Sequence, residues 1–549
     1  MELLDATLKP RHSAIKRLSL LLLLASSSWS AGAFFNILDY GARNDGSVPA
    51  TEAIRSAIQA AKAAGGGTVF IPAGNYSSGP IELVSNLTLH IDAGATVRFP
   101  AARLPLTAGR QQGVEALTPV PLIGGRYLEN VAITGRGVLA SDNAEWMKLM
   151  PRQNVSAGDP GSANGPNWER LLQLLEIKTP APQEAYLRAA PELRPSFVRF
   201  MDSRNVLVEG VRFAGSPMWT IHLLYSDNVS VRDVIIETYP GVHTDGIAVD
   251  SSRNVRISNC YIDTGDDGIV IKAGKDADGL RVNRPSENIS ITNCTVHHAH
   301  GAVTIGSETS GWVRNLVASN LTCAGTAIGV RIKSSRGRGG GVENVRFDNW
   351  VMDDVGQAIS VTNYYLMEGE VRRDGAEPVT NRTPVLRDIA IGNMSIRRTR
   401  VAIDVEGLPE MPISGLRISN VVAAAKAGMK AFNTAGMELH NVQIDADRGP
   451  AFLVRDSRDL ELDNVSTRLP HEDAPVVRLD RTPGAIVRAS RALLGTGTFL
   501  TTGPGELKSI ILEGNVLTGA RQPTAEVKAD YWKSTEPPTE AEPAASHVK

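Results

Sequence analysis

A short pattern recurs along this chain and constrains its fold more than any other feature. Each copy approximates Asn, apolar, any, apolar, any, Asn, as in NVSVRD and NVRISN. Apolar residues alternate within each copy, which predicts a short strand. The six clearest copies start 23, 26, 34, 27 and 29 residues apart, at Asn205, Asn228, Asn254, Asn288, Asn315 and Asn344. A fixed motif with variable spacing in this range indicates a solenoid whose loops differ in size.

Short strands that recur once per coil, without helices between them, favour an all-β fold. We predict a right-handed single-stranded parallel β-helix, in which Asn side chains at one turn form a ladder with those of the next coil. A leucine-rich repeat is the alternative, but the Leu consensus and the regular period are missing. The first coil needs a cap, because an open sheet edge pairs with other chains. The segment Thr51 to Ala64 is predicted to be this N-terminal capping helix, ended by three glycines.

The chain divides into three parts. Residues 1–33 read as an export signal, with basic residues before the apolar run Leu18 to Ala25 and a small-x-small site at Ala31 to Ala33. An uncleaved membrane anchor is the alternative. Residues 34–522 form the β-helix domain, with an insertion at about 141–195 that includes a predicted helix, Trp168 to Ile177. Residues 523–549 are rich in Pro, Glu, Ala and Thr and read as a disordered tail. We expect a secreted or periplasmic protein.

The composition is that of an ordinary globular protein, with 549 residues, 42% hydrophobic and a net charge of −2. No nucleic-acid partner is indicated, because no basic sheath is present. No membrane association is expected once the signal is removed, and a monomer is expected. The three cysteines rule out a disulfide scaffold. Cys260 and Cys294 occupy equivalent places in two repeats, where two buried thiols are favoured over a disulfide.

Two segments, HTDGIAVD and GDDGIVIK, align with an offset of 22 residues, about one coil. Equivalent positions in successive coils form what we call a column. The alignment places Asp245 beside Asp267, and Asp250 beside Lys272. Stacked carboxylates repel one another, and a purely structural fold would avoid them. A pair of carboxylates suits glycoside hydrolysis, because one can hold a proton for the leaving oxygen while the other activates water.

The next two coils add a histidine and two cations to this strip. Alignment of HGAVTI puts His300 in the column of Asp266, and alignment of IGVRIK puts Lys333 in the column of Lys272. Arg331 and Lys333 are two residues apart and so share one face of a strand. Together they can bind a carboxylate. A sugar that carries a carboxylate is a uronic acid.

These motifs resemble glycoside hydrolase family 28, the polygalacturonases, and its bacterial and plant exo-acting branch. The family order NTD, DD, GHG and RIK corresponds here to HTD from His243, DD from Asp266, AHG from Ala299 and RIK from Arg331. The resemblance covers roughly residues 35–370. It implies a pectin-lyase-like solenoid and a secreted hydrolase of α-1,4-linked galacturonic acid in pectin, a cell-wall polysaccharide.

The resemblance also implies residue roles for an inverting mechanism without a metal or another cofactor. Asp266 would be the general acid, while Asp245 and Asp267 would hold and activate the water. His300 would tune the protonation of the acid. Tyr365 matches the sugar-contacting tyrosine of the family, with Tyr364 as the competing register.

The resemblance further implies that Arg331 and Lys333 bind the substrate carboxylate. Two departures concern this site: His243 replaces the family Asn, which affects the sugar contact or the pH optimum, and Ala299 replaces a Gly. Lys272 is a further candidate for substrate contact because it shares a column with Lys333. In the segment SPMWTIH, an offset of 28 residues aligns His222 with Asp250, which predicts that His222 lines the cleft.

Two other functions compete with hydrolysis. A pectate lyase would use Ca²⁺ bound by the clustered Asp residues and an Arg base, but the RIK and HG motifs argue against it. A non-catalytic binding protein of the tail-spike kind would have no use for an intact acid and base. Within the family, endo-acting enzymes and enzymes that cleave rhamnogalacturonan-type backbones remain alternatives to exo action.

Overall fold

The computed structural model describes residues 33–148, 170–171, 174, 183–189, 192–366 and 372–528. The predicted export signal, apart from residue 33, lies outside these residues, as does most of the helix predicted at Trp168 to Ile177. Among the described residues, no helix is long and apolar enough to cross a membrane.

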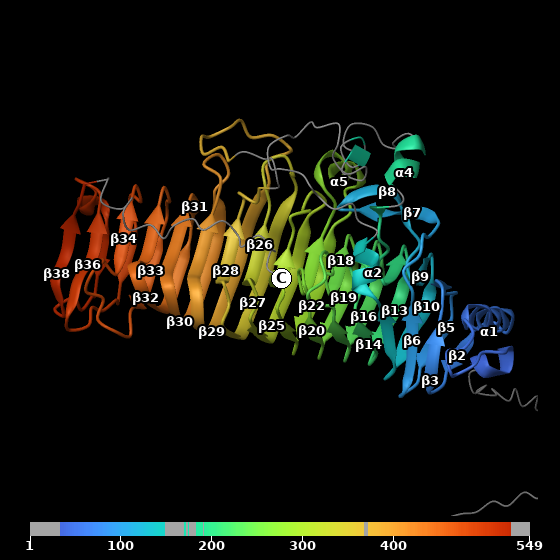
Figure 1. The fold of residues 1–549 in the computed structure, drawn as a ribbon. Coiled ribbons are helices and arrows are strands. Elements are labelled where there is room, and N and C mark those ends of the chain that lie inside the picture. Colours follow the sequence, from blue (N-terminus) through green and yellow to red (C-terminus); the bar gives the residue numbers. More distant parts are fainter. Residues whose placement is uncertain are drawn as a thin grey trace, which may run out of the picture.

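The described chain is a parallel β-helix, and this confirms the predicted fold class (Figure 1). Each coil contributes strands to three faces, and each strand pairs in parallel with its counterpart in the next coil. The face that matters most here, which we call the site sheet, comprises β4 (Ile81–Glu82), β9 (Ile123–Arg126), β12 (Val198–Met201), β15 (Ile221–Leu224), β18 (Ile247–Asp250), β21 (Ile269–Lys272), β24 (Gly301–Ile305), β26 (Ile328–Lys333), β28 (Gln357–Thr362), the later parts of β29 (Val385–Glu406), β30 (Ile413–Phe432) and β32 (Glu438–Arg455), and then β34 (Val477–Asp480), β36 (Thr496–Thr502) and β38 (Ala520–Glu526).

The other two faces are built in the same way. The second face comprises β1 (Phe34–Asn36), β2 (Gly67–Ile71), β5 (Leu87–Ile91), β10 (Glu129–Gly135), β13 (Arg204–Glu209), β16 (Asp227–Arg232), β19 (Arg253–Ser258), β22 (Ser286–Thr292), β25 (Val313–Ala324), β27 (Gly341–Asp353), the earlier parts of β29, β30 and β32, and then β33 (Glu461–Ser466), β35 (Ile486–Arg488) and β37 (Ile511–Glu513). The third face begins with β3 (Gly74–Ser77), β6 (Ala95–Phe99), β11 (Val138–Ser141), β14 (Arg212–Ala214), β17 (Ile235–Glu237), β20 (Tyr261–Asp263) and β23 (Thr295–His297). The short elements η1 (Ile37–Tyr40), β31 (Thr434–Ala435) and η3 (Leu507–Ser509) complete the coils.

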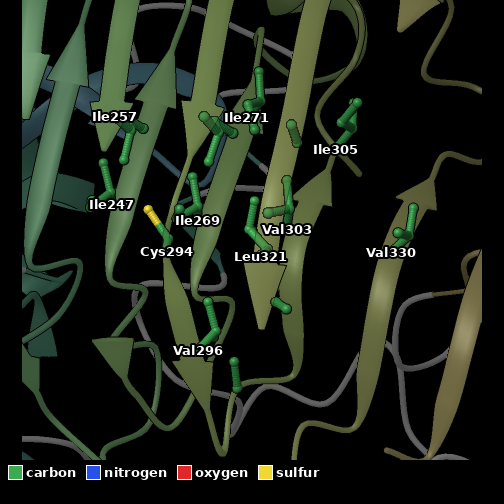
Figure 2. Packing of buried hydrophobic residues seen from close by; sticks show 14 of the residues in the cluster. Ile247, Ile257, Ile269, Ile271, Cys294, Val296, Val303, Ile305, Leu321 and Val330 are labelled. Carbon is green, nitrogen blue, oxygen red and sulfur yellow. The ribbon is translucent and has the colours of Figure 1, made fainter. Parts of the chain in front are cut away.

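Apolar side chains fill the interior because alternate residues of each strand point inward. Ile247, Ile269, Val303 and Val330 are paired from coil to coil and form one inward column, which Figure 2 shows from close by. All four are fully buried. The core therefore consists of stacked apolar columns, and the outward residues between them are free to carry chemistry.

Asparagine ladders hold the turns in register, as the sequence predicts. Asn228 Nδ2 donates to Asn205 Oδ1 at 2.7 Å, and Asn344 Nδ2 donates to Asn315 Oδ1 at 2.8 Å. The ladder asparagines adopt a positive φ near 55°, a left-handed conformation that Asn tolerates better than most residues. Asn254 departs from the pattern and donates to Asp227 Oδ1 at 2.7 Å.

The capping helix is confirmed as α1 (Thr51–Ala63), which buries Ile54 and Ile58 against the first coils. At the other end, β38 pairs with β36 and extends the β-helix through Glu526. The predicted domain boundary at residue 522 is therefore four residues too early, because the strand accommodates Pro523 at the sheet edge. Residues 529–549 of the predicted tail lie outside the described residues.

A yellow-to-orange loop projects from one side of the solenoid, and so do three irregular elements nearer the N-terminus (Figure 1). They are the antiparallel hairpin of β7 (Leu106–Gln111) and β8 (Val114–Pro119), the helix α4 (Gln183–Ala189) and the helix α5 (Asp276–Val282). α2 (Asn143–Lys148) begins the predicted insertion and buries Trp146 in the core. The sequence did not predict the hairpin, because its apolar alternation looks like that of a coil.

The three cysteines are buried thiols. The pairing of Tyr261 with Thr295 places Cys260 beside Cys294 in adjacent coils. The predicted stacking of Cys260 on Cys294 is therefore confirmed, and both residues are free thiols, as favoured from the sequence.

Candidate active site

Strand register brings the predicted carboxylates together on the outside of the site sheet. Ile247 pairs with Ile269, which places Asp245 beside Asp267 at the start of β18 and β21. Ile269 pairs with Val303, which places His300 beside Asp266. One oxygen from each of Asp245, Asp266 and Asp267 lies within 4.8 Å of the others.

Asp267 lies at the centre of the cations. Lys333 Nζ donates to its Oδ2 at 3.1 Å, and Arg331 Nη1 lies 3.5 Å from its Oδ1. Thr304 Oγ1 donates to Oδ1 at 2.8 Å. Burial alone would raise the pKa of this carboxyl, but Lys333 and Arg331 outweigh it and hold the pKa below its usual range. Asp267 is therefore ionised and placed to act as a base.

Asp266 lies at the open edge of the cluster. Its Oδ1 accepts from the backbone N–H of Asp267 at 2.8 Å and lies 3.3 Å from His300 Nδ1. Burial opposes its ionisation, but the hydrogen bond and charge of His300 outweigh burial and lower the pKa of Asp266. The same hydrogen bond raises the pKa of His300. The two groups thus form a coupled pair whose charge states depend on each other.

Asp245 is the carboxyl that is most readily protonated. Its side chain is buried, and burial together with the negative charge of Asp266 raises its pKa well above the usual range, although Lys272 opposes this. Like charges in a confined site cannot all ionise. Asp245 therefore holds a proton more readily than Asp266 or Asp267, whose pKa values are lowered.

Lys272 is held inside the site. Its Nζ donates to Glu308 Oε2 at 3.0 Å and lies 4.9 Å from the centroid of the Trp219 ring. Burial would lower the pKa of Lys272, but Glu308 and Asp245 raise it overall. Lys272 is thus a fixed positive charge behind Asp245. Lys272 and Lys333 share one column, as predicted, with Gly306 between them.

Arg331, Lys333 and Tyr365 form one cationic and aromatic surface. The centroid of the Tyr365 ring lies 4.8 Å from Lys333 Nζ and 5.5 Å from Arg331 Cζ. The Tyr364 ring instead packs against Arg336 and Arg372. This geometry supports Tyr365, rather than the competing Tyr364, as the tyrosine beside the carboxylates.

His243 lies at the edge of the trio with a positive φ of 56°. Its Nδ1 is 3.3 Å from Arg194 Nη2, and burial lowers its pKa. Asn, Asp and His adopt such a backbone conformation more often than other non-glycine residues do. The sequence missed Arg194, which is buried and also donates to the carbonyl of Val242 at 2.9 Å.

The prediction that His222 lines the cleft is wrong. Ile221 pairs with Ile247, so the coil offset is 26 residues and His222 aligns with Ala248, not with Asp250. The predicted offset of 28 failed because the turns between these strands differ in length. His222 is 1% exposed, and its Nε2 lies 3.5 Å from Asp250 Oδ2. It is a buried partner of Asp250 with no surface for a ligand.

The hairpin of β7 and β8 covers the site sheet ahead of the carboxylates. Arg110 Nη1 donates to Asp250 Oδ1 at 2.5 Å and to Ser251 Oγ at 2.8 Å, and the Arg110 and Asp250 side chains are fully buried. Arg199 of β12, on the site sheet, donates to Thr118 Oγ1 of β8 at 2.6 Å. The hairpin leaves Arg199 only 4% exposed. On the other side of the carboxylates, a groove of about 970 Å³ begins at His300 and runs beside the site sheet along the later coils.

The three carboxylates also have the donor set of a cation site. Lys272, Arg331 and Lys333 already compensate their charge, and each would repel a metal ion bound there. The arrangement is thus charge-balanced by side chains, and it brings a carboxyl with a raised pKa close to one with a lowered pKa.

Comparisons with known proteins agree with this geometry. The profile described as Glycosyl hydrolases family 28 matches residues 184–434, and one described as Rhamnogalacturonase A/epimerase, pectate lyase-like matches residues 34–101. A probable polygalacturonase of Vitis vinifera is 26% identical over 71% of this chain and 75% of its own length. An exo-poly-alpha-D-galacturonosidase of Dickeya chrysanthemi is 28% identical over 60% of this chain and 57% of its own length.

The crystal structure of a hyperthermoactive exopolygalacturonase from Thermotoga maritima is 34% identical, with a TM-score of 0.66, over 75% of this chain and 92% of that one. The chain belongs to glycosyl hydrolases family 28. This family 28 protein is therefore a glycoside hydrolase, and the resemblance inferred from its four motifs is confirmed.

Sequence reasoning missed two side chains of this family 28 site besides Arg194. Thr304 follows His300 by four residues, and its hydroxyl binds Asp267. Glu308 is buried and pairs with Lys272. Thr304 could have been found from strand alternation, because it shares a face with Arg331 in the next coil.

Proposed function

We propose that this family 28 hydrolase cleaves α-1,4-linked galacturonic acid in pectin and acts from one end of the chain. The observation that carries the substrate assignment is the cationic surface of Arg331 and Lys333 directly against Asp267. A buried fork and a buried ammonium together suit a carboxylate. The similar proteins named above as polygalacturonases and exo-acting enzymes support the same substrate.

In the proposed mechanism, Asp266 protonates the leaving oxygen, and Asp245 and Asp267 position the attacking water. In the free site the pKa of Asp245 is raised, whereas that of Asp266 is lowered. A bound uronate brings its own negative charge to Arg331 and Lys333, and this charge raises the pKa of nearby carboxyls. Asp266 then takes up the proton that it donates. His300, which stabilises the ionised form of Asp266, controls this uptake.

Water attacks directly in this proposal, so the anomeric configuration inverts. The carboxylate oxygens lie closer together than the roughly 6.5–9.5 Å usual for inverting enzymes. The assignment of inversion therefore rests on family membership. Proton NMR of the first product formed tests it: the β-anomer of the reducing sugar is expected, and an α-anomer would reveal a double displacement.

Exo action is proposed because the hairpin of β7 and β8 covers the site sheet on one side of the carboxylates. The hairpin of β7 and β8, anchored by Arg110, covers the coils before Asp245, while the groove after His300 is open. A chain can then enter only until its end meets the hairpin. Product sizes over time from long oligogalacturonides test this: one small product should dominate from the start, whereas an early ladder of intermediate sizes would show endo action.

Export of the protein is also proposed, from the signal-like segment at residues 1–33. Expression of the full chain in a bacterial host tests it. The protein is expected outside the cytoplasm with an N-terminus near residue 34. Recovery of the intact N-terminus in the membrane fraction would identify an anchor.

A further inference from the structure

The groove that begins at His300 contains a column that continues the catalytic one. Strand pairing aligns His300 with Ala327, then Gly356, then Arg400, then Lys426. His300 itself lies in the column of Asp266. Each coil advances by ~4.8 Å, so Arg400 and Lys426 stand ~19 and ~24 Å along the solenoid from Asp266.

Small residues make the hollow between these positions. Ala327 and Gly356 occupy the two coils between His300 and Arg400, and both line the groove. A Cβ on Gly356 would lie 3.2 Å from Arg400 Nη2 and 2.5 Å from the carbonyl of Ala327. The Arg400 guanidinium thus lies close to Gly356, and the backbone of Ala327 leaves no room for a side chain at this position.

Irregular strand pairing places Arg398 and Lys426 at the edge of the groove. The pairing of β29 with β30 shifts between Ile396 and Thr399, and that of β30 with β32 shifts between Ala427 and Met429. Such bulges redirect neighbouring side chains. Arg398 and Lys426 flank the two shifts, and both are exposed and line the groove.

The groove and the site sheet beside it differ in the charges of their side chains. Arg398, Arg400 and Lys426 line the groove together with the carboxylates of Asp354 and Asp447, and Arg398 Nη2 donates to Asp353 Oδ2 at 2.6 Å. On the sheet itself, the outward residues beyond Arg331 and Lys333 include Asp404 and Glu406, which share Lys430 at 3.2 Å each. Among the described residues, the groove therefore carries more cationic side chains than carboxylates, and this favours a polyanion there.

An aromatic pair stands at the entrance. The rings of Tyr239 and His298 stack with their centroids 4.5 Å apart, and His298 Nδ1 lies 2.9 Å from Asp263 Oδ1. Tyr239 is 55% exposed. A ring fixed in this way offers an apolar face to a sugar next to the carboxylates.

We propose that the polymeric remainder of the substrate leaves the site sheet at His300 and binds in this side groove, with its carboxylates on Arg400 and Lys426. This inference rests on the proposed function, because it assumes a polyuronate substrate. A disaccharide spans too few coils to reach these cations, whereas a chain of six or more sugars reaches both. Binding strength should therefore increase with chain length through these two residues.

The test compares Arg400→Gln and Lys426→Glu with Arg397→Gln, an exposed neighbour that does not line the groove. Substrates of two to eight galacturonate units are compared by kcat/KM. Exposed charge pairs each contribute modestly to binding. The two substitutions together should therefore lower kcat/KM about ten-fold on the octamer, and the loss should become smaller as the substrate shortens to the dimer. Arg397→Gln should match wild type at every length. A loss that is equal at all lengths, or absent, would overturn the inference.

A binding measurement separates this inference from the proposed function. Calorimetry with the full chain carrying Asp266→Asn gives Kd for each oligogalacturonide without turnover. If wild type does not hydrolyse any of them, the proposed function fails, while the groove is still tested by whether Lys426→Glu weakens octamer binding more than trimer binding. Equal weakening, or none, would refute the groove by itself.

Discussion

Replacement of Lys333 by Ala tests two roles of one ammonium group. Lys333 Nζ lies 3.1 Å from Asp267 Oδ2, and their side chains are 8% and 2% exposed. The variant loses one buried charge-assisted hydrogen bond and one cation for the substrate carboxylate. A bond of this kind is worth about 1.5–3 kcal/mol, so kcat/KM on un-esterified oligogalacturonides should fall roughly ten- to a hundred-fold.

The pH profile of the same variant carries a second expectation. Lys333 helps to hold the pKa of Asp267 below its usual range, so its removal raises that pKa. Asp267 must be ionised to act as a base, and the acidic limb of kcat/KM should therefore move to higher pH. Lys333→Arg keeps the charge and serves as the matched control, with a smaller shift.

The assay measures kcat/KM across pH on oligogalacturonides with and without methyl esters. The loss should be greater on the free acid, because the ester offers Lys333 no charge. An acidic limb that stays in place, together with equal losses on both substrates, would mean that Lys333 only holds the strand in position.

Three further expectations concern catalysis, metals and stability. Asp266→Asn should leave the melting temperature nearly unchanged and lower kcat by ~10²–10⁴-fold, and Asp245→Asn and Asp267→Asn should lower kcat by a similar factor; near-normal turnover in any of them would remove that residue from its role. Activity should survive EDTA, with products that lack the ultraviolet absorbance of unsaturated uronides; calcium dependence with such absorbance would identify a lyase. Burial raises the pKa of Asp404 to about 6, so its stabilising protonated form is lost as pH rises through about 6. Asp404→Asn should therefore raise the melting temperature above pH 6 and have little effect below pH 4; the opposite trend would refute the assignment.

Strand periodicity explains why much of the site could be predicted. Side chains alternate across a strand and repeat at fixed positions from coil to coil, so motif alignment alone placed Asp245 beside Asp267 and His300 beside Asp266. The alignment failed for His222, because no sequence rule gives the lengths of the turns that separate the strands.

Other features have no local signal in the sequence. Arg110 and Asp250 are 140 residues apart, and their buried ion pair depends on how the hairpin folds over the sheet. The charge state of Asp266 depends on the position of the His300 ring, which side-chain packing determines. Both are properties of three-dimensional contact and could not be derived from periodicity.

The hairpin of β7 and β8 has a consequence for how enzymes of this shape diversify. Each coil of a solenoid contacts only its neighbours, so one turn can lengthen into a hairpin while the catalytic coils keep their register. If the hairpin determines exo action, as proposed, the mode of attack and the chemistry are encoded in separate, exchangeable stretches of chain. Transplanting residues 105–120 into an endo-acting relative, with an arginine and an aspartate at the anchoring positions, becomes a practical route to converting one depolymerisation pattern into another.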